Sequence, residues 1–257
     1  MKRRASAESG FSLIEMMVSV GVFMVLAGAA FGLLIAAQQR QGTESQLLDS
    51  FQAARLSLDD IVRDVSNAGY PPSSFFSYTP PAVPPANLYA AAPFAWSPGY
   101  ATNPPCSINA TCTTPGQFDL VIETNLDPQN TNNVSWIRYQ LQGTTLFRTV
   151  AQKTPGGDPV TVLNKADQVP YVENVVNNPP RGQQLDNLQK QYPGIFANGP
   201  VPVFSYFDSE SNVVTDPTGI VDVNVTLVVM ARDADPRTGV LRVAELNGRA
   251  RRLNPGP

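Results

Sequence analysis

The sequence predicts an α+β protein in which a long N-terminal helix packs against a head made mainly of antiparallel β-sheet. Three observations support this fold class. Residues 11–69 are apolar or helix-periodic, residues 70–116 are rich in proline and aromatic side chains, and residues 117–257 contain short β-rich segments separated by turn residues. A long helical pattern followed by a run of strands is typical of α+β folds. The same boundaries divide the helix into a first half, 11–37, and an amphipathic continuation, 38–69.

Composition excludes several classes of protein. The 257 residues carry 18 basic and 21 acidic side chains, a net charge of −3, whereas nucleic-acid-binding proteins usually present a basic surface. There is no histidine, which excludes histidine-dependent nucleophiles and histidine-ligated zinc. The sequence has no P-loop, dinucleotide fingerprint or nucleophile elbow. We therefore expect a non-enzymatic protein that binds neither a cofactor nor nucleic acid.

Residues 11–37 have the length and composition of a membrane-spanning helix. Their one charged side chain is Glu15. A helix needs about 20 apolar residues to cross a hydrocarbon layer roughly 30 Å thick, so this segment has length to spare. Lys2, Arg3 and Arg4 precede it, and the positive-inside rule then keeps the N-terminus in the cytoplasm and exports the remainder.

The N-terminus does not resemble an ordinary secretory signal. Such a signal has an apolar stretch of about 7 to 15 residues that ends at a small-residue cleavage site. Here the apolar stretch is longer, and the sharp boundary lies before it, at Gly10–Phe11. Glu15 is costly within a bilayer, by about 2.5–3.5 kcal/mol on insertion scales, so it requires a compensating partner.

A basic leader, Gly10, the sequence Phe11-Ser-Leu-Ile-Glu15 and an apolar helix together resemble the class III signal of type IV pilins and type II secretion pseudopilins. The resemblance implies that a prepilin peptidase cleaves between Gly10 and Phe11 and that Phe11 is then N-methylated. It implies an inner-membrane protein with a periplasmic head, which later joins a pilus or pseudopilus filament. The implied partners are this peptidase, other major and minor pilins, and an inner-membrane assembly platform.

Three residues of the span are candidates for assembly. In the filament that the resemblance implies, the Glu15 carboxylate would pair with the Phe11 ammonium of a neighbouring subunit. Gly28 and Gly32 form a small-xxx-small pattern, which allows two helix backbones to approach closely. Lipid-facing glycines are the alternative interpretation of that pattern.

Helical periodicity continues beyond the span as one apolar stripe, which we expect to pack under the head. Its members are Leu47, Phe51, Ala54, Leu58, Ile61, Val62 and Val65. Asn67-Ala-Gly69, followed by Pro71 and Pro72, predicts that the helix ends near Asn67.

The segment 71–105 combines many prolines with aromatic side chains, so it is predicted to be a loop rather than a strand. Its aromatic residues either pin the loop to the head or form an exposed binding surface. Cys106 and Cys112 follow it in the exported part of the chain, where a disulfide is permitted, and we expect one between them.

The remaining chain shows β-rich segments, and the hairpin signal Gln142-Gly143 lies between two of them. The predicted strands are 118–123, 134–141, 144–150, 160–163, 169–176, 201–207, 220–230 and 240–246. An insertion at 177–199 interrupts them and contains a predicted short helix at 183–191.

Two acidic segments are weak candidates for calcium, namely Asp208–Asn212 and the pair Asp233 and Asp235. The second segment lacks the ligand pattern of a calcium loop, and polar turns explain both better, so no metal site is predicted.

The order of the segments is similar to that of PilW-type minor pilins and J-type minor pseudopilins. This second resemblance implies a subunit at or near the filament tip that helps to start assembly. A minor pseudopilin and a tip adhesin carried on a pilin scaffold remain alternatives, since all three share the same N-terminal features.

Overall fold

The computed structural model describes residues 12–72, 75, 88–90, 93–94, 116–127, 134–154, 157–214, 219–232, 234 and 239–254. Its helices are α1 (Leu13–Ser66), α2 (Pro159–Leu163), α3 (Gln183–Gln191) and α4 (Pro193–Phe196). Its strands are β1 (Asp119–Asn125), β2 (Val134–Gln142), β3 (Thr145–Gln152), β4 (Gln168–Val172), β5 (Phe204–Phe207), β6 (Asp222–Met230) and β7 (Val243–Arg251). The predicted α+β class is confirmed.

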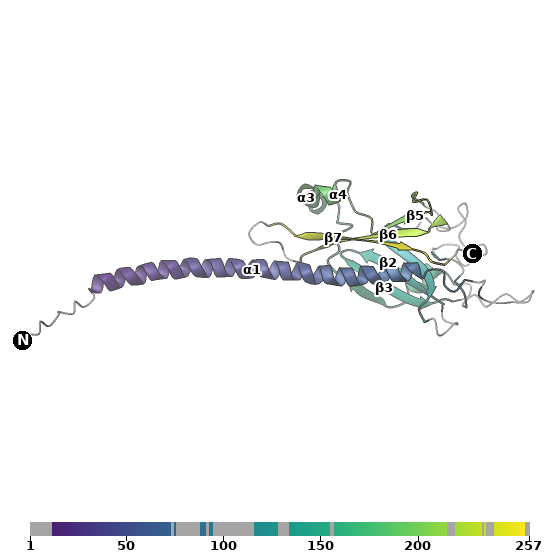
Figure 1. The fold of residues 1–257 in the computed structure, drawn as a ribbon, viewed down its shortest axis with the longest axis horizontal. Helices are drawn as coiled ribbons and strands as arrows, with labels where there is room; N and C mark the ends of the chain where they lie inside the picture. The colour runs from purple at the N-terminus through teal and green to yellow at the C-terminus, as the bar shows by residue number, and fades with distance from the viewer. Residues whose placement is uncertain are drawn as a thin grey trace, which may run out of the picture.

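The long helix α1 is continuous through both of its predicted halves. It has 54 residues, which corresponds to a length of about 80 Å at 1.5 Å per residue. Asn67 forms its C-cap, and Gly69 follows with a φ of 84°, a left-handed conformation that favours glycine. The predicted end near Asn67 is therefore confirmed. Figure 1 shows the first half of α1 projecting from the head as a bare helix and the second half lying within the head.

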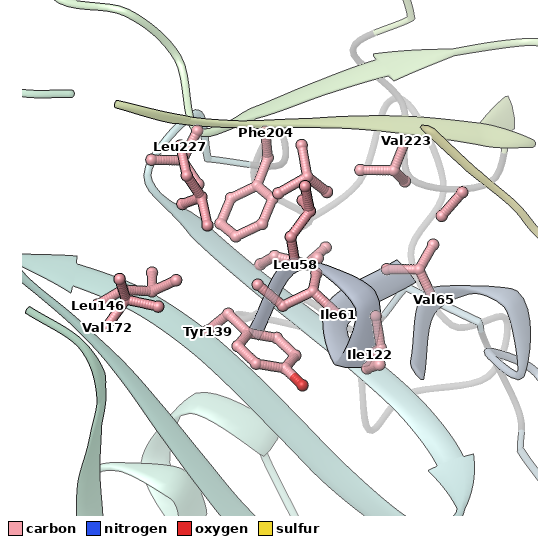
Figure 2. Packing of buried hydrophobic residues seen from close by; sticks show 14 of the residues in the cluster. Leu58, Ile61, Val65, Ile122, Tyr139, Leu146, Val172, Phe204, Val223 and Leu227 are labelled. Carbon is pink, nitrogen blue, oxygen red and sulfur yellow. The ribbon is translucent and has the colours of Figure 1, made fainter. Parts of the chain in front are cut away.

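The strands form two antiparallel sheets, with the orders β1-β2-β3-β4 and β5-β6-β7. The hairpin between β2 and β3 turns at Gly143 and Thr144, with Gln142 opposite Thr145 and a φ of 60° at Gly143. This confirms the hairpin predicted at Gln142-Gly143. The second half of α1 lies between the two sheets (Figures 1 and 2), so each sheet covers one side of the helix.

The apolar stripe of α1 forms the centre of the main core. Ala54, Ile61 and Val65 have no exposed surface and Leu58 is buried, while Phe51 and Val62 are partly buried against the same cluster. Side chains from both sheets complete this core, among them Ile122, Tyr139, Leu146, Phe204, Val223 and Leu227. Figure 2 shows the residues of α1 between these two sets. Burying a large apolar side chain contributes about 1.5–3 kcal/mol, so the helix is an integral part of the head.

Two backbone connections join the sheets to each other. After β4 the chain crosses over, and the Val175 N–H donates to the Thr144 carbonyl at 2.8 Å while Val175 also pairs with Val229 of β6. On the other side, the Phe204 N–H donates to the Gln117 carbonyl at 2.9 Å. The head is therefore one packed unit around α1.

One predicted strand is wrong. Residues 160–163 form part of helix α2, because Asp158 caps the helix by accepting from the Val160 N–H at 2.9 Å and Pro159 occupies the first helical position. The strand predicted at 169–176 ends at Val172, and Asn174 beyond it has a φ of 59°. Strand β7 begins later than predicted and continues to Arg251.

The insertion 177–199 packs on the three-stranded sheet as a small second layer. Helix α3 occupies the predicted range 183–191. Leu188 and Phe196 pack with Val228 in a separate apolar cluster. The buried Asn177 side chain ties the insertion to the sheet, since its amide donates to the Thr226 carbonyl at 2.8 Å and its oxygen accepts from the Val228 N–H at 2.8 Å.

Candidate membrane anchor and its junction with the head

The first half of α1 presents apolar side chains on every side. All of its large apolar residues from Leu13 to Ile35 are exposed, by 47–78% of their surface. By length and composition, α1 is the one helix in the described part of the chain that could cross a membrane. So much apolar surface is not stable in water, so this segment needs lipid or other helices around it.

The first turn of α1 supplies an intrachain partner for Glu15. The Ser12 N–H donates to Glu15 Oε2 at 3.0 Å, in the capping-box arrangement that satisfies one of the free N–H groups at a helix start. The negative carboxylate also lies at the positive end of the helix dipole. Gly10 and Phe11 lie outside the described residues. Pairing of Glu15 with a neighbouring subunit stays a prediction.

Gly28 and Gly32 lie on the exposed part of α1. A Cβ atom added at either position would meet no atom within 4 Å. In the single chain both positions therefore face open space, and a role of the two glycines in helix packing stays a prediction.

Two tyrosine–aspartate hydrogen bonds fasten α1 to the four-stranded sheet. The Tyr139 hydroxyl donates to Asp64 Oδ2 at 2.6 Å, and the Tyr171 hydroxyl donates to Asp60 Oδ2 at 2.6 Å. Arg148 binds the same Asp64 oxygen at 3.0 Å and donates to the Tyr139 hydroxyl at 3.0 Å. Burial and then the Asp64 charge raise the pKa of Tyr139 above its usual value. The junction is thus held in one orientation by directional polar bonds as well as by apolar contact.

Sequence reasoning missed these junction residues. Asp60 and Asp64 are four positions apart on α1 and flank the apolar stripe, so they share a helix face. That spacing was an available signal. Their partners Tyr139, Arg148 and Tyr171 come from three different strands, and the sequence alone does not show which strands reach the helix.

The described parts of the Pro-rich loop are attached to the head. The Glu123 N–H donates to the Pro93 carbonyl at 3.0 Å, and Phe94 is 2% exposed and pairs with Ile122. The Lys153 ammonium donates to the Tyr89 carbonyl at 2.9 Å and forms a buried ion pair with Glu123. At these points the loop is pinned to the head, which was the first of the two alternatives predicted for its aromatic residues. The rest of the loop, including Cys106, Cys112 and their predicted disulfide, lies outside the described residues.

The first of the two acidic segments proposed as weak calcium candidates forms a polar turn. Asp208 Oδ1 accepts from the Glu210 N–H at 2.8 Å and from the Asn212 N–H at 2.9 Å, and the bonds from Asn212 lower the pKa of Asp208. The Asp208 carboxylate therefore stabilises the turn that it belongs to. Asp233 and Asp235 lie outside the described residues, and within the described ones no group of three acidic, cysteine or histidine side chains could hold a metal.

Comparison with known protein families finds a match at the N-terminus. Residues 5–31 match the prokaryotic N-terminal methylation motif. No curated protein matches the chain significantly. The motif covers the leader, the Gly10–Phe11 boundary, Glu15 and the bare half of α1 as far as Phe31. Together with the long helix and the antiparallel head, it supports a type IV pilin- or pseudopilin-like precursor, and the exposed apolar helix is consistent with membrane anchoring.

Proposed function

We propose that the chain is a minor pilin of the PilW type, a non-enzymatic subunit at or near the tip of a type IV pilus. A prepilin peptidase cleaves it after Gly10 and methylates Phe11. Its span holds it in the inner membrane with the head in the periplasm until the assembly platform moves it into the filament with other major and minor pilins.

The observation that supports this function best is the division of α1 into two halves with opposite surroundings. The half from Leu13 to Ile35 is bare, whereas the apolar stripe of the half from Ala54 to Val65 is buried between the sheets. A subunit built in this way can exchange lipid for neighbouring helices along its first half while the head stays folded. The methylation motif, residues 5–31, includes most of this bare half, where such an exchange would take place.

Two alternatives use the same anchor. A J-type minor pseudopilin would enter a secretion pseudopilus, and a tip adhesin would add a binding surface on the Pro-rich loop. Deleting residues 73–87 separates the adhesin from the other two, because assembly would continue while adhesion is lost. Comparing filament formation with protein secretion in cells lacking the chain separates pilin from pseudopilin.

The decisive experiment is mass spectrometry of the N-terminus of the protein from cells with and without the prepilin peptidase. We expect a methylated Phe11 as the first residue in the first strain and the intact leader in the second. A chain that keeps its first ten residues in a host with an active peptidase would contradict the proposal.

A further inference from the structure

Strand β7 lies at one edge of the three-stranded sheet, and its outer side carries free backbone groups. In an antiparallel pair, two residues directly opposite each other either exchange hydrogen bonds or both point away. Thr226 of β6 points away from β7, because its N–H donates to the Val203 carbonyl at 2.8 Å. Asn247 stands opposite Thr226, so its N–H and carbonyl point to the outer side of β7. By the alternation along the strand, those of Glu245 and Arg249 do the same.

We call the N–H and carbonyl groups of Glu245, Asn247 and Arg249 the outer edge of β7. Within the described residues, no backbone group of the chain forms a hydrogen bond with them. The side chains of the same three residues are exposed. The outer edge is therefore open to another chain.

Each of the other three sheet edges has a cover in the described part of the chain. At the edge formed by β1, the Glu123 N–H donates to the Pro93 carbonyl at 3.0 Å. At the edge formed by β5, the Tyr206 carbonyl accepts from the Val214 N–H at 3.0 Å. Strand β4 contains Pro170, which has no N–H to offer. Because open strand edges pair readily with other chains, proteins usually cover them, and an edge left open along a strand of nine residues points to a partner.

Helix α1 leaves an apolar side chain open beside this edge. Glu44 of α1 lies next to Arg242, just before β7, with Oε1 and Nη1 3.7 Å apart. Leu48 follows Glu44 by one helical turn, so both lie on the same side of the helix. Leu48 is 58% exposed. A strand added to β7 would cover it, so the partner strand should carry an apolar residue on its inner face.

The direction of β7 argues against symmetric pairing of two copies. Its start lies near Glu44, and just past its end the Leu253 N–H donates to the Ser66 carbonyl of α1 at 3.1 Å. Strand and helix therefore run in the same direction. Two β7 strands paired antiparallel would direct their α1 helices oppositely, so both spans could not share one membrane or filament. The more stable antiparallel pairing thus requires a different strand, one that runs toward the membrane in its own subunit.

We propose that the outer edge of β7 is an interface that takes up an extended strand of a neighbouring filament subunit, paired antiparallel. This inference rests on the proposed function, which supplies the neighbours. In such strand addition, backbone hydrogen bonds give the affinity and alternate side chains give the specificity. The exposed Glu245 carboxylate accepts from the Asn247 amide at 2.9 Å on the outer face of the sheet. A basic residue of the partner strand should therefore lie opposite Glu245.

The variant Asn247→Pro tests the backbone of this edge. It removes an outward N–H and keeps the hydrogen bonds to β6, since proline is tolerated on an edge strand where the N–H faces outward. Asn247→Thr is the matched control, because it loses the same amide side chain and keeps the N–H. We expect Asn247→Pro to lower the ratio of full-length subunit in sheared filaments to that in membranes by at least about tenfold, and Asn247→Thr to stay within about twofold of the wild type. Thermal unfolding in detergent checks that both variants are folded.

Photo-crosslinking decides the question even if the proline variant does not fold. Benzoylphenylalanine is placed at position 247 of the full chain, and its cross-links in sheared filaments are mapped by mass spectrometry. We expect them to fall on a β-strand of another pilin subunit. The same amino acid at Lys190, which is exposed on α3, is the control and should not reach that strand.

Several results would overturn the inference. Folded Asn247→Pro that enters filaments as well as the wild type would show that the edge is not used. Cross-links from position 247 that fall only on helices, loops or proteins outside the filament would exclude strand addition by a neighbouring subunit. Cross-links between the 247 positions of two copies would identify a second copy as the occupant. If the wild-type chain itself is absent from filaments, the proposed function fails and the inference fails with it, whereas normal assembly of both wild type and proline variant contradicts the inference alone.

Discussion

Gly248 of β7 lies directly beneath Leu58 of α1. A Cβ atom at position 248 would come within 2.9 Å of Leu58 Cδ1 and within 3.1 Å of Leu58 Cγ and Val62 Cγ2. The missing side chain therefore allows the close approach of helix and sheet, and a larger residue must shift the Leu58 and Val62 side chains or α1 itself.

From this contact we predict that Gly248→Val destabilises the head. Valine suits a strand better than glycine, but overpacking a well-filled core costs about 1–3 kcal/mol, so the steric effect should prevail. Urea unfolding of the full chain in detergent would measure the change. Asn247→Val is the matched control, since its side chain is exposed on the same strand and should change stability by no more than about 0.5 kcal/mol. Equal effects of the two variants would contradict the steric explanation.

The second prediction concerns the buried ion pair of Lys153 and Glu123, whose side chains are 5% and 0% exposed. Lys153→Met should destabilise the head by about 3–5 kcal/mol, because it leaves the Glu123 charge buried without its counter-ion. The double variant Lys153→Met/Glu123→Gln should recover part of that loss.

Arg63→Met provides the comparison for this pair. Arg63 pairs with Asp60 at 2.7 Å, but both side chains are well exposed, so the loss should stay below about 1 kcal/mol. A double-mutant cycle by urea unfolding would check both values. If the double variant is less stable than Lys153→Met alone, the unpaired charge is not the cause.

Sequence periodicity was sufficient for the elements that depend on local signals. The stripe of α1, its end near Asn67 and helix α3 follow from spacing and end signals, and the structure has them where predicted. Helix α2 was missed because three β-branched residues, Val160, Thr161 and Val162, outweighed the Asp158-Pro159 start signal.

Long-range partners could not be predicted in the same way. Nothing local indicates that the strands divide into two sheets around α1, since this depends on which strands pair. Nor does any local signal show that Glu123, the last residue of the predicted strand 118–123, is buried. It is buried because β1 is covered on both faces, partly by Phe94 from the Pro-rich loop.

The third prediction is a loss of stability in alkali. Burial raises the pKa of Tyr139, Tyr171 and Tyr206 in the folded head, with neighbouring aspartates adding to the shift. In the unfolded chain these phenols lose their protons near pH 10. The unfolded state then binds fewer protons than the folded one, so the stabilisation present below pH 10 falls as the pH rises above it. The fall is about 1.4 kcal/mol per pH unit for each of the buried Tyr139 and Tyr206, and less for Tyr171, which is partly exposed to solvent.

Urea unfolding between pH 8 and pH 11 would measure this slope. Tyr206→Phe should make the slope of stability against pH shallower by the contribution of one tyrosine. The variant also loses the hydrogen bond that the Tyr206 hydroxyl donates to the Gly116 carbonyl at 2.7 Å, which lowers stability at every pH below the phenol's ionisation. An unchanged slope in this variant would show that the Tyr206 phenol ionises equally in both states.

The fourth prediction separates the two roles of Glu15. The variant Glu15→Gln keeps an oxygen that can accept from the Ser12 N–H, because glutamine also serves in a capping box, but it removes the charge. The helix start should therefore persist, and the subunit should still insert and lose its leader. Assembly should fall by at least about tenfold, the factor that corresponds to about 1.4 kcal/mol, if a neighbouring ammonium pairs with the carboxylate.

Quantifying the subunit in sheared filaments and in membranes would give this ratio. Asp49→Asn, an exposed acid on the same helix beyond the span, should assemble normally. Normal assembly of Glu15→Gln would mean that Glu15 acts only within its own chain, through the bond to Ser12.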